Sequence, residues 1–154
     1  DDYYPPDRVS SVVEAFSKNP QIDLAGSSEM NLFYTDTQKI YKLEGYNKNH
    51  ATNGTMAYKA SYLKDHSYLN DKERAEEANF TNNFSEPMVQ LDPHKVMLCV
   101  AHDKNTVDKD QFLQQGKETV HKLHKFFKIN DKRLVLFRHY SYVYTVRLRE
   151  IRYE

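Results

Sequence analysis

The chain has a single cysteine, only four glycines and no tryptophan among its 154 residues. One cysteine excludes an internal disulfide, and the position of Cys99 in the apolar run VMLCVA predicts a buried, unreactive thiol. With so few glycines, tight mirror-type hairpin turns must be rare, and longer loops built on Asn and Asp are expected. No run approaches about 18 apolar residues, so no membrane-spanning helix is expected.

The formal net charge is zero, because 22 Lys and Arg residues balance 22 Asp and Glu residues. This balance argues against a nucleic-acid-binding protein, which normally carries a basic excess. The apolar fraction is low, at 39%, but 12 tyrosines and 8 phenylalanines argue against disorder. We therefore expect one folded domain over residues 1–154, with a polar surface and a core filled largely by rings.

Catalytic and metal-binding signatures are absent as well. The sequence contains no G-x-S-x-G, P-loop, G-x-G-x-x-G, H-E-x-x-H or EF-hand spacing, and Cys99 lies in an apolar strand where a reactive thiolate is disfavoured. His121 and His124 share a helix face, but a zinc site needs three or four ligands, so we interpret them as solvated. The prediction is a protein that is not an enzyme and holds no metal or cofactor.

The compartment is indicated by three N-x-S/T sequons, at Asn53, Asn79 and Asn83. The chain begins with Asp1 rather than Met, which predicts processing or excision from a longer chain. The lone cysteine argues the other way, because small secreted domains usually carry disulfides. We predict a secreted, extracellular glycoprotein with glycans on the three asparagines.

Hydrophobic periodicity predicts two helices and a series of strands. A short amphipathic helix is expected over Asp7–Ser17, and a long one over Asp108–Lys128, where Asp108 and Gln111 resemble a capping box. Gly116 in the apolar stripe of the long helix predicts a close approach to a sheet. The charged stretch 69–79 is interpreted as a loop or one helical turn. Alternating or apolar runs predict strands within 29–35, 38–46, 55–63, 66–70, 95–102 and 132–153, with weaker candidates at 79–85 and 88–91.

The segment 95–137, KVMLCVAHDKNTVDKDQFLQQGKETVHKLHKFFKINDKRLVLF, resembles the strand–helix–strand end of lipocalins, the divergent arthropod type in particular. The resemblance implies a mainly β fold with two helices. In it, an antiparallel eight-stranded barrel encloses a ligand cavity, with the short N-terminal helix and the long C-terminal helix packed outside. The alternative is an α+β antiparallel sheet with helices on one face.

The tyrosines suggest a role for such an interior, since Tyr140, Tyr142 and Tyr144 recur at every second position of one strand. Inward tyrosines supply an apolar wall and hydroxyl groups that need partners. They can equally pack across strands, or form an exposed surface for a partner protein. The residues predicted to line a ligand pocket are Tyr41, Met56, Tyr58, Tyr62, Tyr140, Tyr142 and Tyr144.

The leading functional hypothesis is a secreted, non-enzymatic carrier that sequesters a small hydrophobic or amphiphilic molecule, a lipid or an amine, in the barrel. One alternative is a secreted protein–protein interaction module, immune-modulating or host-factor binding, with no small ligand. Another is an enzyme on a cone-shaped α+β barrel, which requires strongly perturbed pKa values around one pocket.

Overall fold

The computed structural model describes residues 2–69, 76–102, 105 and 108–119. The predicted strand 132–153, His121, His124 and the long helix beyond residue 119 lie outside these residues. The chain divides into two compact units, each treated separately below. Unit 1 comprises Asp1–Tyr3, Asn31–Leu43 and Leu98–Glu154, and unit 2 comprises Tyr4–Met30 and Glu44–Met97.

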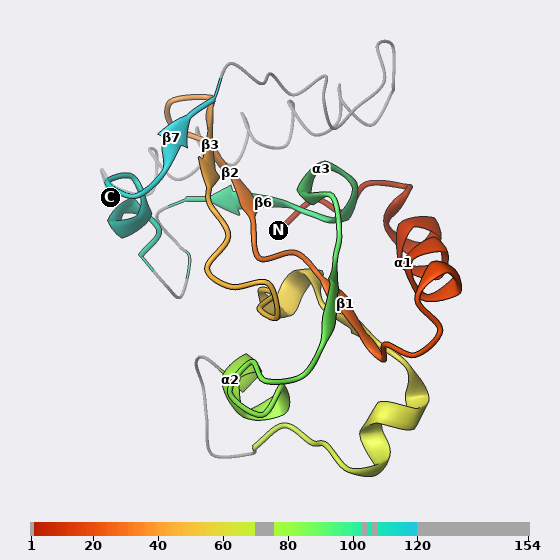
Figure 1. The fold of residues 1–154 in the computed structure, drawn as a ribbon. Coiled ribbons are helices and arrows are strands. Elements are labelled where there is room, and N and C mark those ends of the chain that lie inside the picture. Colours follow the sequence, from red (N-terminus) through yellow and green to blue (C-terminus); the bar gives the residue numbers. More distant parts are fainter. Residues whose placement is uncertain (1, 70–75, 103–104, 106–107, 120–154) are drawn as a thin grey trace, which may run out of the picture. The chain divides into compact units, whose positions relative to one another are not determined.

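Unit 2 is built on a three-stranded mixed sheet in the order β4-β1-β5 (Figure 1). The central strand β1 (Leu24–Gly26) pairs antiparallel with β4 (Ala57–Tyr58) and parallel with β5 (Met88–Gln90). Gly26 is required at its position because a Cβ there would lie 2.4 Å from the Ala51 Cβ. The loop that carries Ala51 therefore packs directly against the β1 backbone.

Helices pack against both faces of this sheet. Successive side chains of β1 point to opposite faces, so Leu24 and Ala25 belong to different buried clusters. On one face Leu24 belongs to a buried cluster with Ala51, Met56, Tyr62, Phe80 and Met88. Phe80 comes from α2 (Glu76–Phe80) and Tyr62 from the 3₁₀ helix η2 (Ala60–Lys64). On the other face Ala25 packs with Ala15 of α1 (Arg8–Lys18) and Val96 of α3 (Pro93–Val96).

Unit 1 contains a four-stranded mixed sheet in the order β6-β2-β3-β7. The strands β2 (Met30–Tyr34) and β6 (Leu98–Ala101) are parallel, whereas β3 (Lys39–Leu43) and β7 (Lys117–Glu118) are antiparallel. The outer edge of β6 is covered by Tyr3, whose N–H donates to the Leu98 carbonyl at 2.9 Å and whose carbonyl accepts from the Leu98 N–H at 2.8 Å. Two short 3₁₀ helices complete the described elements: η1 (Asn53–Thr55) in unit 2 and η3 (Asp110–Phe112) in unit 1.

The predicted eight-stranded barrel is wrong for the described residues, where neither sheet closes on itself. The fold is α+β, with three short α-helices among the described residues. The alternative of an antiparallel sheet with helices on one face is corrected too. Each sheet contains a parallel pair, and helices lie on both faces of the unit 2 sheet. Parallel partners require long crossovers, which a local alternating pattern does not reveal.

Several predicted elements are confirmed. The first helix, the strands within 29–35, 38–46 and 88–91, and a strand within 95–102 are present as α1, β2, β3, β5 and β6. Cys99 is buried in β6, as expected. The expected core filled largely by rings is not found among the described residues, because Phe33, Tyr34, Tyr62 and Phe80 are only four of its 19 buried apolar residues.

Other predicted elements are wrong. The run 55–63 forms only the two-residue β4 before η2, and 66–70 and 79–85 form no strand in their described residues. The described start of the long helix is η3 followed by β7. There Asp108 Oδ1 accepts from the Asp110 N–H at 2.9 Å and Gln111 Nε2 donates to the Asp108 carbonyl at 2.6 Å, so the capping residues close one 3₁₀ turn.

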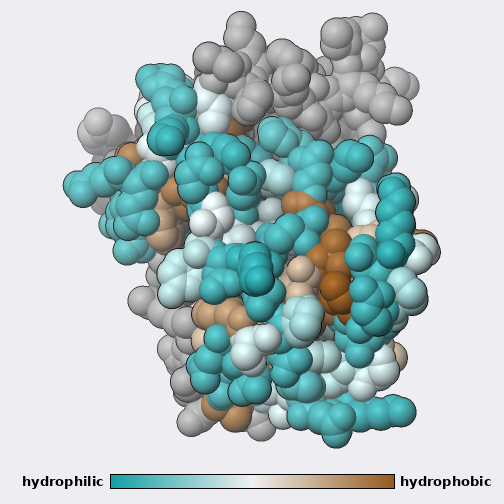
Figure 2. Space-filling model, viewed as in Figure 1, coloured by the Kyte–Doolittle hydropathy of each residue, from teal (hydrophilic) through white to brown (hydrophobic). Residues whose placement is uncertain are grey.

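The face of the protein in Figure 2 is largely hydrophilic, with apolar residues in small groups. This agrees with the polar surface expected from the composition. Within the described residues, no helix combines the length and apolarity needed to cross a membrane.

Candidate functional site

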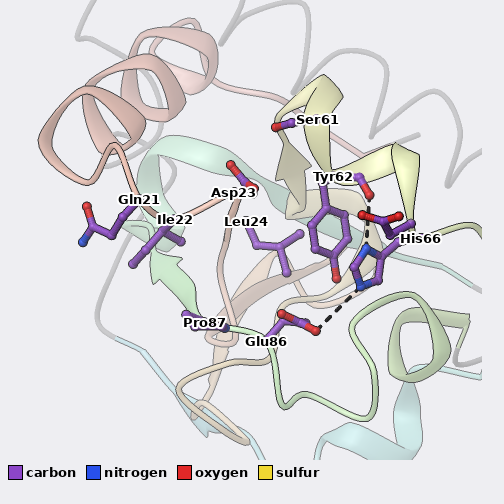
Figure 3. Close-up of a pocket in the computed structure, with 10 residues that line it drawn as sticks. Gln21, Ile22, Asp23, Leu24, Ser61, Tyr62, His66, Glu86 and Pro87 are labelled. Atoms are coloured by element: carbon purple, nitrogen blue, oxygen red, sulfur yellow. Dashed lines mark hydrogen bonds and ion pairs between the residues drawn. The ribbon is translucent and has the colours of Figure 1, made fainter.

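A pocket of about 200 Å³ lies in unit 2, where the starts of two strands meet a 3₁₀ helix (Figure 3). Because β1 and β5 are parallel and Leu24 is in register with Met88, the segments that precede both strands lie at the same edge of the sheet. The third wall is η2 and the turn after it. The lining residues are Gln21, Ile22, Asp23, Leu24, Ser61, Tyr62, Asp65, His66, Glu86 and Pro87.

Tyr62 is the fixed wall of the pocket. It is 7% exposed, and its hydroxyl donates to the Phe80 carbonyl at 2.9 Å inside the core. Burial, assisted by the negative charges of Glu86 and Asp23, raises the pKa of Tyr62 to about 12. The phenol therefore stays protonated at neutral pH, and its ring presents a rigid apolar surface.

His66 stacks on this ring four residues later in the chain, with centroids 3.8 Å apart and planes 7° from parallel. Its Nδ1 lies 3.1 Å from the Tyr62 carbonyl oxygen, which can only accept, so Nδ1 carries a proton. Its Nε2 faces Glu86, with 3.6 Å between Nε2 and Oε1 (Figure 3). Both ring nitrogens are thus directed at protein groups rather than at the pocket centre.

Three carboxylates give the pocket its charge. Asp23 is compensated by Lys59, whose Nζ lies 3.2 Å from Oδ1 and also donates to the Pro20 carbonyl at 2.6 Å. Asp65 and Glu86 have no Lys or Arg partner among the described residues; the only ion-pair contact of either is that of Glu86 with His66. The pocket is consequently negative whenever His66 is neutral, which favours a cationic ligand.

The predicted pocket residues are distributed as follows. Tyr62 lines the pocket, whereas Met56 is buried in the core cluster beside it. Tyr58 is 37% exposed and packs its ring on Phe80, with centroids 5.0 Å apart. Tyr41 belongs to unit 1, where it meets Tyr34 edge-on at 5.3 Å. Tyr140, Tyr142 and Tyr144 lie outside the described residues, and ligand binding by this set stays a prediction.

The three sequon asparagines are all exposed. The Asn53 side chain is engaged: its Nδ2 donates to Glu76 Oε1 at 2.7 Å, and its Oδ1 accepts from the Tyr68 hydroxyl at 2.8 Å. A glycan on Nδ2 would replace one of the two amide hydrogens there. Glycosylation of Asn53, Asn79 and Asn83 stays a prediction.

Sequence reasoning missed the charged part of the pocket. Asp65 lies between the predicted strands 55–63 and 66–70, His66 begins the second of these, and Glu86 and Pro87 lie between the weaker candidates 79–85 and 88–91. The one available signal is that polar residues accompany a tyrosine at short range in YLKDH. Nothing local connects this stretch with Asp23 or Glu86, because the parallel pairing of β1 and β5 brings them together.

Comparison of this chain with protein-family models, with curated proteins and with solved structures found no match. The lipocalin resemblance of segment 95–137 therefore rests on the sequence alone, and functional inference depends on the geometry of the pocket.

Proposed function

We propose that this protein binds a small organic cation in the pocket between β1, β5 and η2, without catalysing a reaction on it. The observation that carries the proposal is the presence of both Asp65 and Glu86 in the lining of a cavity whose fixed wall is the Tyr62–His66 stack. Carboxylates attract an ammonium group, and an adjacent aromatic wall accommodates its hydrocarbon part. Of the two ligand classes expected from the sequence, an amine fits this lining better than a lipid.

The size of the cavity supports a small ligand. Its volume of about 200 Å³ is below the range of about 300–1,000 Å³ typical of sites for drug-sized molecules. A metal ion is a poorer match, because no three His, Cys, Asp or Glu residues are grouped to hold one anywhere in the described part of the chain. An organic ammonium does not need such a ligand shell, because single carboxylates and a ring suffice.

The same contacts support binding without catalysis. The obvious general base is His66, but its Nδ1 is held by the Tyr62 carbonyl and its Nε2 faces Glu86. A general base must lie within hydrogen-bond reach of the substrate proton, and the Nε2 lone pair of the neutral ring points at Glu86 rather than at the pocket centre. The Tyr62 hydroxyl is likewise committed to the Phe80 carbonyl. These groups therefore shape and charge the pocket rather than exchange protons with a ligand.

Calorimetric titration of the purified protein with butylamine, beside butanol as an uncharged control, tests the proposal. Binding of butylamine alone is expected, and Glu86→Gln should weaken it several-fold by removing one charge. Glu14→Gln is the matched control, because Glu14 pairs with Lys18 on the exposed side of α1 and does not line the pocket. Equal loss in the two variants, or no heat with butylamine, would contradict the proposal.

A second candidate, the protein–protein interaction module, is favoured by a separate observation. Val9 and Val13 stand one turn apart on α1 and are 71% and 58% exposed. Exposed apolar pairs of this kind contribute to docking surfaces. If this face binds a partner, the variant Val9→Ser/Val13→Ser should lose that partner in a binding assay and keep butylamine affinity. Retained partner binding together with lost butylamine affinity would contradict this second function.

A further inference from the structure

We infer that the natural ligand of the pocket is a dication, a short aliphatic diamine, and that protonation of His66 weakens its binding. This inference rests on the proposed cation-binding function and specifies its ligand class and its control. It follows from the number of uncompensated charges around the pocket and from the position of His66 among them.

The number of carboxylates without a cationic partner indicates how many charges a ligand should carry. Of the three lining carboxylates, Asp23 is already paired with Lys59 at 3.2 Å. Asp65 and Glu86 are left, so a neutral His66 leaves two negative charges beside one small cavity. One ammonium group can pair with only one of these carboxylates and leaves the other without a partner. Two ammonium groups on one molecule match both charges.

The apolar part of the lining fits the rest of such a molecule. Leu24 points towards the Tyr62 ring, both belong to the buried cluster beneath the pocket, and Ile22 lines the pocket on the other side of Leu24 (Figure 3). Methylene groups between two ammonium ends can pack on these side chains, while the ends reach the carboxylates. A single-headed amine would make the same apolar contacts with only one charged contact.

His66 sets the charge of the pocket because its ring is held in place. With Nδ1 directed to the Tyr62 carbonyl, a second proton goes to Nε2, which faces Glu86 at 3.6 Å. The imidazolium then compensates Glu86 internally, and one ammonium group of the ligand loses its partner. The titratable and charged groups around this ring are Tyr62, on which it stacks, and its chain neighbour Asp65, together with Glu86 before β5, Asp23 before β1 and Lys59 after β4.

The experiment compares putrescine with butylamine, which has the same carbon chain and one ammonium group, by calorimetric titration of the whole chain. At about pH 8 we expect putrescine to bind about fivefold more tightly, equivalent to about 1 kcal/mol, the value of one exposed ion pair. That preference should disappear at a pH low enough to protonate His66, which the NMR shifts of its ring protons report. His66→Phe keeps a ring on Tyr62 without the switch, so its putrescine preference should persist at both pH values.

The possible outcomes distinguish failure of the diamine inference from failure of the proposed cation-binding function. Equal affinity for putrescine and butylamine at about pH 8 overturns the diamine inference and leaves the cation-binding function standing. A preference that does not change with pH, or that changes equally in His66→Phe, overturns the role of His66. No binding of either amine overturns the proposed function itself. Far-UV circular dichroism of His66→Phe confirms that the variant is folded before its affinities are compared.

Discussion

Thr55 provides the sharpest test of how unit 2 is held together, because its hydroxyl serves three backbone groups in a buried site. The residue is 2% exposed, and its Oγ1 accepts from the Ser27 N–H at 2.9 Å. The same oxygen lies 3.1 Å from the Ser27 carbonyl and 2.9 Å from the Thr52 carbonyl, either of which can take its proton. Thr55 thereby joins the chain after β1 to the turn before β4.

Thr55→Val preserves the shape of the side chain but leaves the Ser27 N–H without an acceptor in a site closed to water. A buried donor left unsatisfied costs about 1–3 kcal/mol, so the free energy of unfolding should fall by about 2–3 kcal/mol. Thr55→Ser is the matched variant, since it keeps the hydroxyl and loses one methyl group, with an expected loss of about 0.5–1.5 kcal/mol. The Val variant should therefore be the less stable of the two.

Urea unfolding followed by far-UV circular dichroism measures both values. The proteins should be produced in bacteria, because Thr55 completes the Asn53 sequon and Thr55→Val would otherwise also remove a glycan. If Thr55→Val unfolds within about 0.5 kcal/mol of the original protein, or if Thr55→Ser is the weaker variant, the buried hydroxyl does not hold this junction. A lower m-value in one variant alone would show a changed unfolded or native state instead.

Two further predictions concern the same unit. Gly26→Ala should destabilise it by about 3 kcal/mol, because the new Cβ would lie 2.4 Å from the Ala51 Cβ, and overpacked cores lose about 1–3 kcal/mol or somewhat more. Adding Ala51→Gly should restore part of that loss in urea unfolding, and an unchanged double variant would contradict the steric explanation. Burial holds the pKa of His50 below its ordinary 6.5, so the unfolded chain takes up the proton first and stability should fall as the pH drops below about 6.5. His50→Gln should flatten that fall in thermal melts between about pH 7 and pH 5, and a parallel pH profile would refute the assignment.

The His50 prediction has a structural basis beyond burial. Ser28 Oγ accepts the backbone N–H groups of Tyr46 and Asn47, at 2.8 and 3.3 Å. Its single proton is then available for His50 Nδ1, which lies 2.8 Å away. A neutral ring accepts that proton, whereas a protonated ring presents a second donor to it. The hydrogen-bond network therefore favours the same neutral state of His50 as burial does.

Local pattern predicted those elements whose burial follows from one amphipathic face. In α1, the apolar spacing of Val9, Val12, Val13 and Phe16 predicted the helix; Val12 and Phe16 pack towards the core with Ala15, whereas Val9 and Val13 are exposed. The alternation in β2 and β3 likewise predicted strands, although their partners β6 and β7 lie far along the chain. The pattern within a segment predicts its own conformation, whereas its pairing partner depends on residues dozens of positions away.

The described part of the helix predicted from Asp108, residues 108–119, shows how tertiary pairing overrides propensity. After the single turn of η3, Lys117 and Glu118 pair with β3, and Lys39 Nζ reaches Glu118 Oε2 at 2.9 Å. Gly116 permits this, since a Cβ there would lie 3.2 Å from Leu43 Cδ2. The glycine did mark a close approach to a sheet, as the sequence suggested, but its segment joins that sheet as a strand. Helix propensity, worth tenths of a kcal/mol per residue, is too weak to prevent this.

The pocket was beyond sequence reasoning for a related reason, and Tyr62 shows why. Alternation with Tyr58 suggested that both rings lie on one face of a strand, with their hydroxyl groups available to bind a ligand. In the fold the Tyr62 phenol donates to the Phe80 carbonyl, so its polar requirement is met inside the core and the ring edge borders the cavity. The groups left for a ligand are then the carboxylates of Asp65 and Glu86, which no aromatic pattern highlights. Charge rather than ring content consequently decides what this cavity can hold, and an uncharged amphiphile of the same size should be a poor ligand for it.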